Sequence, residues 1–588
     1  MGCYKLAVAI SGAVSLGSYE AGVMYEIIKA IGQHNLNPDT LPEDRIEIDV
    51  ITGASAGGMT AAITAQKLLF ESNNLEGAFV NHLYKPWVEE VDLMKLLQIG
   101  PKDRPDLSLL SSELILDISK KYLDDRYSSS APTSPKKHAA AADTILLGLA
   151  MSNLNGVDYG MEMRSFQNIA SDDPASQNKF IYTRHQDRFV REVKANPACD
   201  MQSFWDPIRK AAVACGAFPF AFRVQGIERS QTDEAYLGAE PFGFKKLFAY
   251  TDGGAFQNEP LGMAKKLVNQ IDTAHLNHEK RFYLYISPNP KKRSSLNDKF
   301  TAETANYLAT GKALVSAFYT QARFHDWIMT ANTNKDVEIF DHRAEALQGL
   351  LTQSPEKLGE FASVADALLN ALYAGTLGTN QGETQEAALA RLKHQFDKEY
   401  KALLSTLEQK GINQDAALTW LKAVLVLEKA ANLGDRDIMT VYNVTADADE
   451  VAGEKLAAFG GFFDQKYRDF DYTIGRQKAR KLLDMLKSQA GNNSNLPLTN
   501  FAYSEVIKEP DTTLANVTVN DLPKEKRLAL KAAVVERYKT LIDISVKGPI
   551  KHFLVKFFGK IAVSILLGEL LQLNDDTPPK GQEDDDRL

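Results

Sequence analysis

Over the first 290 residues, short apolar runs alternate with longer stretches in which apolar residues recur at helical spacing. The runs Leu6 to Ile10 and Ile48 to Ile51 are almost continuously apolar, as expected for strands buried on both faces. Between them, Tyr19 to Gln33 carries one apolar stripe at helical spacing. Arg281 to Ser287 reads as the last strand of the series. The alternation predicts an α/β domain over residues 1–290, with helices covering both faces of a mostly parallel sheet.

After residue 290 the pattern changes to helical periodicity almost throughout, and we expect residues 291–573 to form an all-α region. Helices are expected at Ala302–Ala331, Glu356–Tyr373, Glu383–Gln409, Asp415–Asn432, Arg476–Ala490 and Lys524–Val546. Residues 574–588 are polar and acidic, and we expect a disordered tail there.

The last helical stretch, Ile550 to Leu573, is strongly apolar. Lys551, Lys556 and Lys560 lie in its first half and leave too short an uncharged run for a membrane-spanning helix. Two interpretations stay open. The helix either lies at a membrane surface with its lysines near lipid headgroups, or is buried against the rest of the protein.

Composition narrows the functional classes. The chain has 588 residues, more than one core usually supports, so at least two domains are expected. Its net charge of −9 argues against a nucleic-acid partner. Cys3, Cys199 and Cys215 show no spacing typical of a metal site or a disulfide framework, so we expect no metal and no cofactor. So few cysteines suit a reducing compartment, which predicts a cytoplasmic protein, with contact at a membrane surface left open.

The most informative motif is Gly53-Ala54-Ser55-Ala56-Gly57, which fits G-x-S-x-G. An apolar strand precedes it and a helical stretch follows it, which is the context of a nucleophile elbow. The sharp turn would strain the backbone of Ser55, while Gly53 and Gly57 would let strand and helix approach closely. The helix N-terminus behind Ser55 would favour developing negative charge. The alternative is a glycine-rich turn that only packs a helix on a sheet.

Two further segments bear on this choice. Ser11 to Ser18 is a glycine-containing loop between a strand and a helix, and such a loop presents backbone N–H groups to an oxyanion or a phosphate. Because the chain has neither G-x-G-x-x-G here nor a P-loop motif, nucleotide binding has little support. Asp252 ends another apolar strand and enters a turn at Gly253 and Gly254. It is either a turn former or, beside a serine elbow, a catalytic base.

Ser11-Gly12-Ala13-Val14-Ser15-Leu16-Gly17, the serine motif and Asp252-Gly253-Gly254 resemble, in this order, the patatin-like phospholipase family. Residues 212–219 are similar to the A-S-x-A-x-P segment of that family, and the resemblance covers residues 5–290. It implies a three-layer αβα hydrolase domain with a Ser–Asp dyad and no histidine. In this dyad Ser55 is the nucleophile, Asp252 is the base, and the amides of Gly12, Ala13 and Val14 form the oxyanion hole.

Three positions depart from the family pattern. The usual glycine triplet is Gly12-Ala13-Val14 here, and the basic residue that commonly follows is replaced by Leu16. A cation at that position would help to hold a phosphate. Hydrolysis of a lipid ester is therefore better supported than the choice of a phospholipid head group.

A carboxylate is a weak base unless it is partly desolvated, so the dyad predicts a sheltered pocket. Its expected walls are the rings of Phe218, Phe220 and Phe222, at least one of which is ordinary core. Ser112 to Tyr127 is expected to be helical and to lead into a surface loop at Ser128 to Lys137. The two segments together fit a lid over the active site or a simple excursion of the chain.

Residues 460–476 alternate aromatic and charged side chains and resemble a segment of larger bacterial patatin-like proteins. They fit either a surface that docks the helical region onto the hydrolase domain or the start of an ordinary amphipathic helix.

Three functions follow, of which the first is favoured. The first is a lipid acyl hydrolase of the phospholipase A or lysophospholipase kind, working through an acyl-enzyme. The second is a Ser-Asp-His esterase. Candidates for its histidine are His278, His325, His342 and His394, which follow Asp252 in the chain. The third is a catalytically weak binding or scaffold protein, which the residues at Ala13, Val14 and Leu16 keep open.

Overall fold

A computed structural model describes the chain in segments. The described residues are 3–104, 106–123, 136–162, 179–194, 201–219, 221–275, 280–288, 439–447, 449–455, 460–489, 495–516 and 521–545, with single residues at 301, 335, 363 and 548. The chain forms two compact units, one of residues 269–278 with 327–440 and one of all remaining residues. Every contact described below lies within the second of these, the larger unit.

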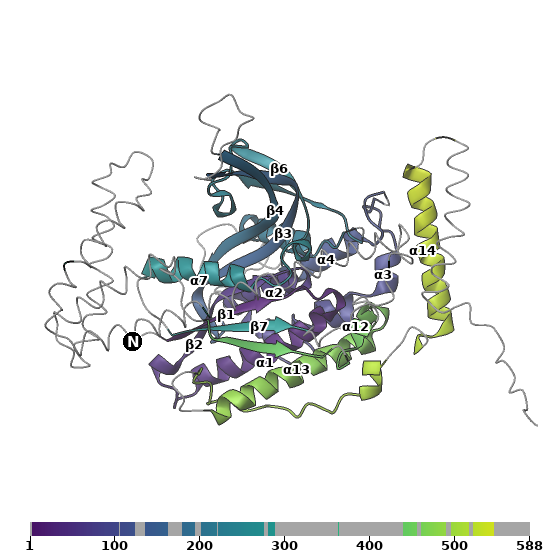
Figure 1. The fold of residues 1–588 in the computed structure, drawn as a ribbon. Coiled ribbons are helices and arrows are strands. Elements are labelled where there is room, and N and C mark those ends of the chain that lie inside the picture. Colours follow the sequence, from purple (N-terminus) through teal and green to yellow (C-terminus); the bar gives the residue numbers. More distant parts are fainter. Residues whose placement is uncertain are drawn as a thin grey trace, which may run out of the picture. The chain divides into compact units, whose positions relative to one another are not determined.

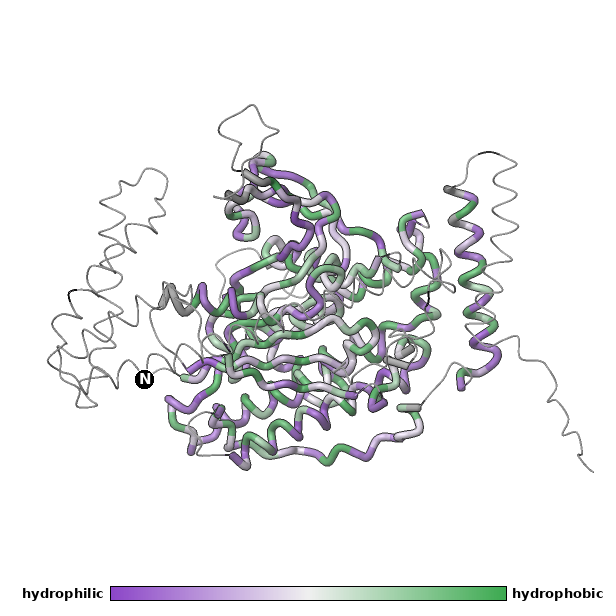
Figure 2. Tube along the Cα trace, viewed as in Figure 1, coloured by the Kyte–Doolittle hydropathy of each residue, from purple (hydrophilic) through white to green (hydrophobic). Residues whose placement is uncertain are grey.

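A mixed sheet forms the centre of the larger unit, with strand order β5-β6-β3-β2-β1-β7-β8 and β4 paired to β3. Its parallel strands are β1 (Tyr4–Ile10), β2 (Ile46–Gly53), β3 (Ala141–Glu162), β7 (Arg281–Ser287) and β8 (Val441–Thr445). Of these, β1, β2 and β7 are almost wholly buried, as their near-continuous apolar sequence predicts. In Figure 2, hydrophobic positions follow the central strands.

An antiparallel extension, which the mostly parallel expectation did not include, grows from β3. It consists of β4 (Lys179–Lys194), β5 (Gln225–Ser230) and β6 (Lys245–Asp252). β4 pairs with β3 along nearly its whole length, from Thr144 to Glu162, while β6 pairs with Met151 to Asn153 of β3, just beyond Leu149, the last partner of β2. Figure 1 shows β3, β4 and β6 rising together from the sheet. This extension delivers Asp252 to the active-site edge.

Helices cover both faces of the parallel strands, with α1 and α13 on one side and α2 and α4 on the other (Figure 1). The helices are α1 (Gly17–Leu36), α2 (Ala56–Phe70), α3 (Leu93–Leu97), α4 (Ser112–Leu123), α6 (Met201–Cys215), α7 (Leu261–His275), α12 (Ala452–Lys455), α13 (Gln465–Ser488) and α14 (Lys524–Ser545). The α/β class and its helix–sheet–helix layering are confirmed.

One strand contradicts the all-α expectation for residues 291–573. β8 pairs in parallel with β7, so this region supplies the edge strand of the sheet. Its five residues, Val441–Thr445, have only two apolar positions buried against the body, Tyr442 and Val444. Such a short alternation is a weak signal inside a long helical stretch, and it becomes a strand only because β7 offers an open edge.

Two of the expected helices in this region are confirmed, since Arg476–Ala490 overlaps α13 and Lys524–Val546 coincides with α14. Apart from residue 363, the other expected helices lie outside the described residues, as does the tail 574–588; these helices are Ala302–Ala331, Glu356–Tyr373, Glu383–Gln409, Asp415–Asn432 and Ile550–Leu573. Within the described segments, no helix combines the length and apolarity that crossing a bilayer requires.

Residues 460–476 fit both interpretations, because they contain the start of α13 and α13 packs along α1. The backbones meet so closely that a Cβ at Gly475 would lie 2.1 Å from the carbonyl oxygen of Tyr19. Glu26 of α1 accepts hydrogen bonds from Arg476 (2.8 Å) and Arg480 (3.0 Å), both on α13. Arg476 and Glu26 are both buried, and each has a second partner, since Arg480 also pairs with Glu26 and Glu505 also pairs with Arg476.

Candidate active site

Ser55 stands on a strained turn between β2 and α2. Its φ of 51° and ψ of −126° lie in a region that non-glycine residues rarely adopt. A Cβ at Gly53 would lie 2.3 Å from the carbonyl oxygen of Gly57, and one at Gly57 would lie 2.4 Å from that of Ser11. The two glycines therefore allow the close approach that a nucleophile elbow needs, as the motif predicts.

Asp252 ends β6 with its carboxylate directed at this serine. Oγ of Ser55 donates a 2.7 Å hydrogen bond to Oδ2 of Asp252. The other carboxylate oxygen, Oδ1, accepts the N–H of Gly254 at 2.7 Å. The backbone N–H of Asp252 donates to the carbonyl of Ala217 at 3.0 Å, in the segment that resembles A-S-x-A-x-P. A Cβ at Gly253 would lie 2.1 Å from the carbonyl oxygen of Ala150, so this turn also depends on glycine.

Burial tunes the acidity of this carboxyl group. Asp252 is almost completely buried, and the loss of hydration raises its pKa to about 6. The hydrogen bonds from Ser55 and Gly254 oppose this rise because they stabilise the charged form. The carboxyl group is thus a stronger base than an exposed aspartate and is still largely ionised at neutral pH.

The loop after β1 lies against the same serine. A Cβ at Gly12 would lie 2.9 Å from Cβ of Ser55 and 2.1 Å from Oδ1 of Asn258, which explains the retained glycine. The Gly12 amide, however, already donates to the carbonyl of Asn258 at 2.9 Å. Gly12 is therefore not a free oxyanion donor in this structure, contrary to the expectation. The amides of Ala13 and Val14 make no hydrogen bond within the described part of the chain.

Of the two residues that replace glycines of the family's triplet, Ala13 and Val14, the second is in the less favourable backbone conformation. Its φ is 51°, in the left-handed region, which costs a non-glycine residue about 1–2 kcal/mol. A β-branched residue is especially unsuited to this conformation. The turn persists only because surrounding contacts hold it.

An apolar pocket opens beside Ser55 and encloses about 730 Å³ of space, open solvent at its mouth included. Its lining residues come from several elements: Val14, Ser55, Ala56, Met59, Ile63, Pro86, Trp87, Val91, Ile115, Ile118, Val213, Gly216, Phe218, Phe222 and Phe462. Phe218 and Phe222 are pocket walls, as expected, whereas Phe220 lies outside the described residues. The expected helix α4 contributes Ile115 and Ile118 to the wall.

Sequence reasoning missed several walls of this pocket. Trp87 belongs to a one-turn π-helix, Pro86–Glu90, in a stretch without a motif. Phe462 lies about 400 positions after Ser55 in the chain. Its segment is predicted from the sequence to be a docking surface or the start of an amphipathic helix, and neither prediction places it in the pocket. Asn258 is not a wall of the pocket but hydrogen-bonds Gly12 through both its backbone and its side chain; it follows Asp252 by six residues and has no distinguishing pattern.

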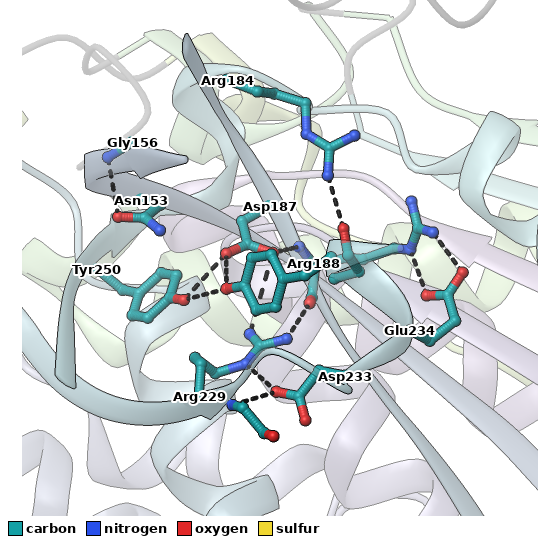
Figure 3. A network of polar contacts seen from close by, with 12 residues as sticks. Asn153, Gly156, Arg184, Asp187, Arg188, Arg229, Asp233, Glu234 and Tyr250 are labelled. Atoms are coloured by element: carbon teal, nitrogen blue, oxygen red, sulfur yellow. Dashed lines mark hydrogen bonds and ion pairs between the residues drawn. The ribbon is translucent and has the colours of Figure 1, made fainter. Parts of the chain in front are cut away.

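A buried polar network lies next to the site and anchors β6 (Figure 3). The hydroxyls of Tyr236 and Tyr250 donate to Oδ2 of Asp187 at 2.5 and 2.9 Å. Nη1 of Arg229 lies 3.9 Å from Oδ1 of the same carboxylate, and Nε of Arg229 donates to Asp233 at 2.8 Å. Tyr250 precedes Asp252 by two residues on β6, so both side chains share one face of the strand. The network therefore holds the strand that presents the carboxylate.

Residues 8–265 match the family model described as patatin-like phospholipase, a family of lipid acyl hydrolases that act on lipid substrates. The curated "Uncharacterized protein y4iI" of Sinorhizobium fredii (strain NBRC 101917 / NGR234) is 28% identical over 190 residues, which cover 28% of this chain and 26% of that protein. This chain thus spans about a quarter of that relative's length. The crystal structure of VipD from Legionella pneumophila aligns with 97% of this chain and 85% of that chain, at 11% identity and a TM-score of 0.25. Both the serine turn and the Asp252 turn fall inside the matched segment, and residues 8–265 of this chain form a patatin-like phospholipase domain.

Proposed function

We propose that this chain is a lipid acyl hydrolase of the phospholipase A or lysophospholipase type that uses Ser55 and Asp252 as a catalytic dyad. The observation that carries the proposal is the direct 2.7 Å hydrogen bond from Oγ of Ser55 to Oδ2 of Asp252, beside an apolar pocket. This distance suits a general base. It also argues against the Ser-Asp-His alternative, because a direct bond leaves no space for an imidazole between the two groups. The four candidate histidines lie outside the described residues.

The reaction would proceed in two halves. Oγ of Ser55 attacks the ester carbonyl carbon while Oδ2 of Asp252 takes its proton, and the amides of Ala13 and Val14, with the N-terminus of α2, stabilise the oxyanion. Collapse of the tetrahedral intermediate expels the alcohol, which takes up from Asp252 the proton that came from Oγ of Ser55. Water, deprotonated by Asp252, then attacks the acyl-enzyme and releases the fatty acid and free Ser55.

The pocket supports an acyl chain as the group held beside the nucleophile. Its lining side chains are apolar apart from Ser55, and none is charged. A fatty acyl chain buries its methylenes there at a gain of about 0.8 kcal/mol each. Leu16 is buried and apolar, so it offers no charge to a phosphate. The polar head group would therefore remain outside this pocket.

Released fatty acids give the direct test of the function. Purified protein is incubated with a mixed lipid extract, and the free fatty acids are profiled against those from Ser55→Ala. Release by the wild type alone supports the hydrolase. If a fluorophosphonate probe labels the wild type as poorly as Ser55→Ala and neither releases fatty acids, a binding or scaffold role replaces the proposal.

The pH profile of kcat/KM should have an acidic limb, a fall toward low pH, that is caused by protonation of Asp252. Below its pKa of about 6 the carboxyl group is protonated and cannot accept the Ser55 proton, so kcat/KM should fall about tenfold per pH unit there. The measurement is hydrolysis of a water-soluble short-chain ester. Asp471, a buried carboxyl group on α13 whose pKa is raised to about 7, is the necessary control. The limb should persist in Asp471→Asn, and a profile that stays flat well below pH 6 would contradict the role of Asp252.

We also assign a membrane-surface contact to the rim of the pocket. The segment before α4 lies against the segment that carries the pocket wall Phe222, since the N–H of Leu110 donates to the carbonyl of Ala221 at 2.9 Å. Exposed apolar side chains on these two segments are Leu107 (37% exposed), Leu109 (40%) and Val224 (38%). Exposed apolar residues next to a lipid-binding pocket fit shallow insertion between lipid headgroups.

The double variant Leu107→Ser/Leu109→Ser should lower hydrolysis of phospholipid vesicles by about tenfold, because less apolar surface can enter the lipid. Hydrolysis of the water-soluble ester should change little, since neither side chain lines the pocket. Leu41→Ser, at another exposed leucine, is the matched control. Equal losses on vesicles and on the soluble ester would show that the rim acts through folding and not through lipid contact.

A further inference from the structure

We propose that residues 460–472, which lie outside the matched family domain, complete the active site. The proposal rests on the hydrolase function above. It states that this segment, here termed the brace, forms one wall of the acyl pocket and holds the loop that carries the Ala13 and Val14 amides. Residues 8–265 alone would then lack part of the catalytic apparatus.

The first contact is direct. Phe462, in the short 3-10 helix Gly460–Phe463, is buried and lines the same pocket as Ser55, together with Val14 and Trp87. A ring at this position limits the length and width of the acyl chain that can lie beside the nucleophile. Phe462 is thus a specificity-determining residue supplied from the C-terminal part of the chain.

The second contact holds the loop after β1. The amide of Gly461 donates to Oγ of Ser15 at 3.2 Å, and Ser15 is fully buried beside the strained Val14. Leu16 packs against α12, which precedes the brace: a Cβ at Gly453 would lie only 2.9 Å from Cδ2 of Leu16. The residue that replaces the family's cation is therefore apolar because another part of the chain covers it. These contacts supply the external support that a positive φ at Val14 requires.

The third contact joins two pocket walls. Nη1 of Arg468 donates to the carbonyl of Gly461 at 2.8 Å, and Nε donates to that of Val88 at 3.0 Å. Val88 follows Trp87 in the π-helical turn, so one guanidinium group ties the Phe462 wall to the Trp87 wall. Arg468 is 1% exposed and is not among the residues that line the pocket, so it acts through the walls that it joins and is a positioning residue.

Buried hydrogen bonds attach the brace to the rest of the larger unit. The hydroxyl of Tyr472 donates to the carbonyl of Ala78 at 2.6 Å and accepts from Nδ2 of Asn81 at 3.1 Å. Asp471 accepts the amides of Ala452 and Gly453, at 2.7 and 3.1 Å, and so fixes the start of α12 on α13. Because these hydrogen bonds fix the position of the brace, the brace can hold the strained loop at Val14 in place.

The test of the pocket wall is acyl-chain selectivity in the full chain. Phe462→Ala should raise kcat/KM for the p-nitrophenyl ester of palmitate relative to that of butyrate by about tenfold, since the removed ring frees room for methylenes. The thermal midpoint is measured alongside. A chain-length profile that matches the wild type within about twofold would show that Phe462 does not contact the acyl chain.

The test of positioning uses Arg468→Met, with kcat on the butyrate ester expressed per active site titrated with a fluorophosphonate. We expect kcat to fall about tenfold or more with KM nearly unchanged, because misplaced amides stabilise the oxyanion less well. Lys481→Met, which removes an exposed positive charge from the same helix, should leave kcat unchanged. A purely structural role for Arg468 would lower the thermal midpoint and the fraction of titratable sites but not kcat per site.

The two proposals fail in different ways. If Ser55→Ala keeps wild-type turnover, the hydrolase function is wrong and the brace has no site to complete. If Ser55→Ala is inactive while Phe462→Ala keeps the wild-type chain-length profile and Arg468→Met keeps the wild-type kcat per site, only the brace proposal is overturned.

Discussion

Replacing Ser55 with alanine should lower kcat by about 10⁴-fold or more, because the covalent route to product is lost. Asp252→Asn should cause a loss of similar order, since the amide cannot take the proton that Oδ2 receives across the 2.7 Å bond. Residues that act as a unit are not additive, so the double variant should be no worse than the poorer single variant. The measurement is steady-state kinetics on a soluble ester, with thermal unfolding as a check on folding.

The control for the dyad is a neighbouring hydroxyl that makes no contact with Oδ1 or Oδ2 of Asp252. Thr60, buried on α2, donates to the carbonyl of Ala56 one turn earlier and is suitable. Thr60→Ala should retain kcat within about threefold while losing some stability. Full activity of Asp252→Asn, with loss of activity on replacing His278 or one of the later histidines, would show that the dyad assignment is wrong and that a histidine is the base.

The second large effect is on stability. Asp187→Leu should destabilise the protein by about 3–5 kcal/mol, because it removes the nearest buried counter-charge of Arg229 and the acceptor of two buried hydroxyls. Burial, together with the carboxylate of Asp187, raises the pKa of Tyr236 and of Tyr250, so both hydroxyls remain protonated and can only donate to it. The measurement is chemical unfolding followed by circular dichroism.

Two further variants separate the contributions in this network. Asp187→Asn keeps an oxygen acceptor for the hydroxyls but loses the charge near Arg229, so its cost should be intermediate. Glu228→Gln removes an exposed ion pair with Lys245 and should change stability by less than about 1 kcal/mol. Equal effects of Asp187→Leu and Glu228→Gln would mean that the buried network contributes no more than a surface pair.

Much of the site could be predicted because its chemistry is encoded locally. The elbow needs glycines within two residues of Ser55, and the turn after Asp252 needs glycines directly beside it, so both leave compact patterns in the sequence. The strain at Ser55 follows from the same local geometry. The hydrophobic alternation likewise identifies buried parallel strands, because every strand of this kind must be apolar along its length.

Other features of the fold and the site could not be predicted, because no local sequence pattern indicates them. The Gly12 amide was expected to face the oxyanion, yet Asn258 engages it from another loop. Val441–Thr445 was expected to lie in an all-α region, yet it forms β8 and completes the edge of the sheet beside β7. The wall formed by Phe462 depends on a helix that docks from the opposite end of the chain.

The sequence by itself determined the nucleophile elbow, the carboxylate turn and the helix–sheet–helix layering, because each depends on neighbours within a few positions or on a repeating burial pattern. Only the tertiary structure decided which amides of the loop after β1 remain free, which side chains enclose the apolar pocket and which segment supports Val14. These depend on contacts between residues hundreds of positions apart. Such contacts form only when the whole chain has packed, and the residues that make them carry no periodic or motif signal of their own.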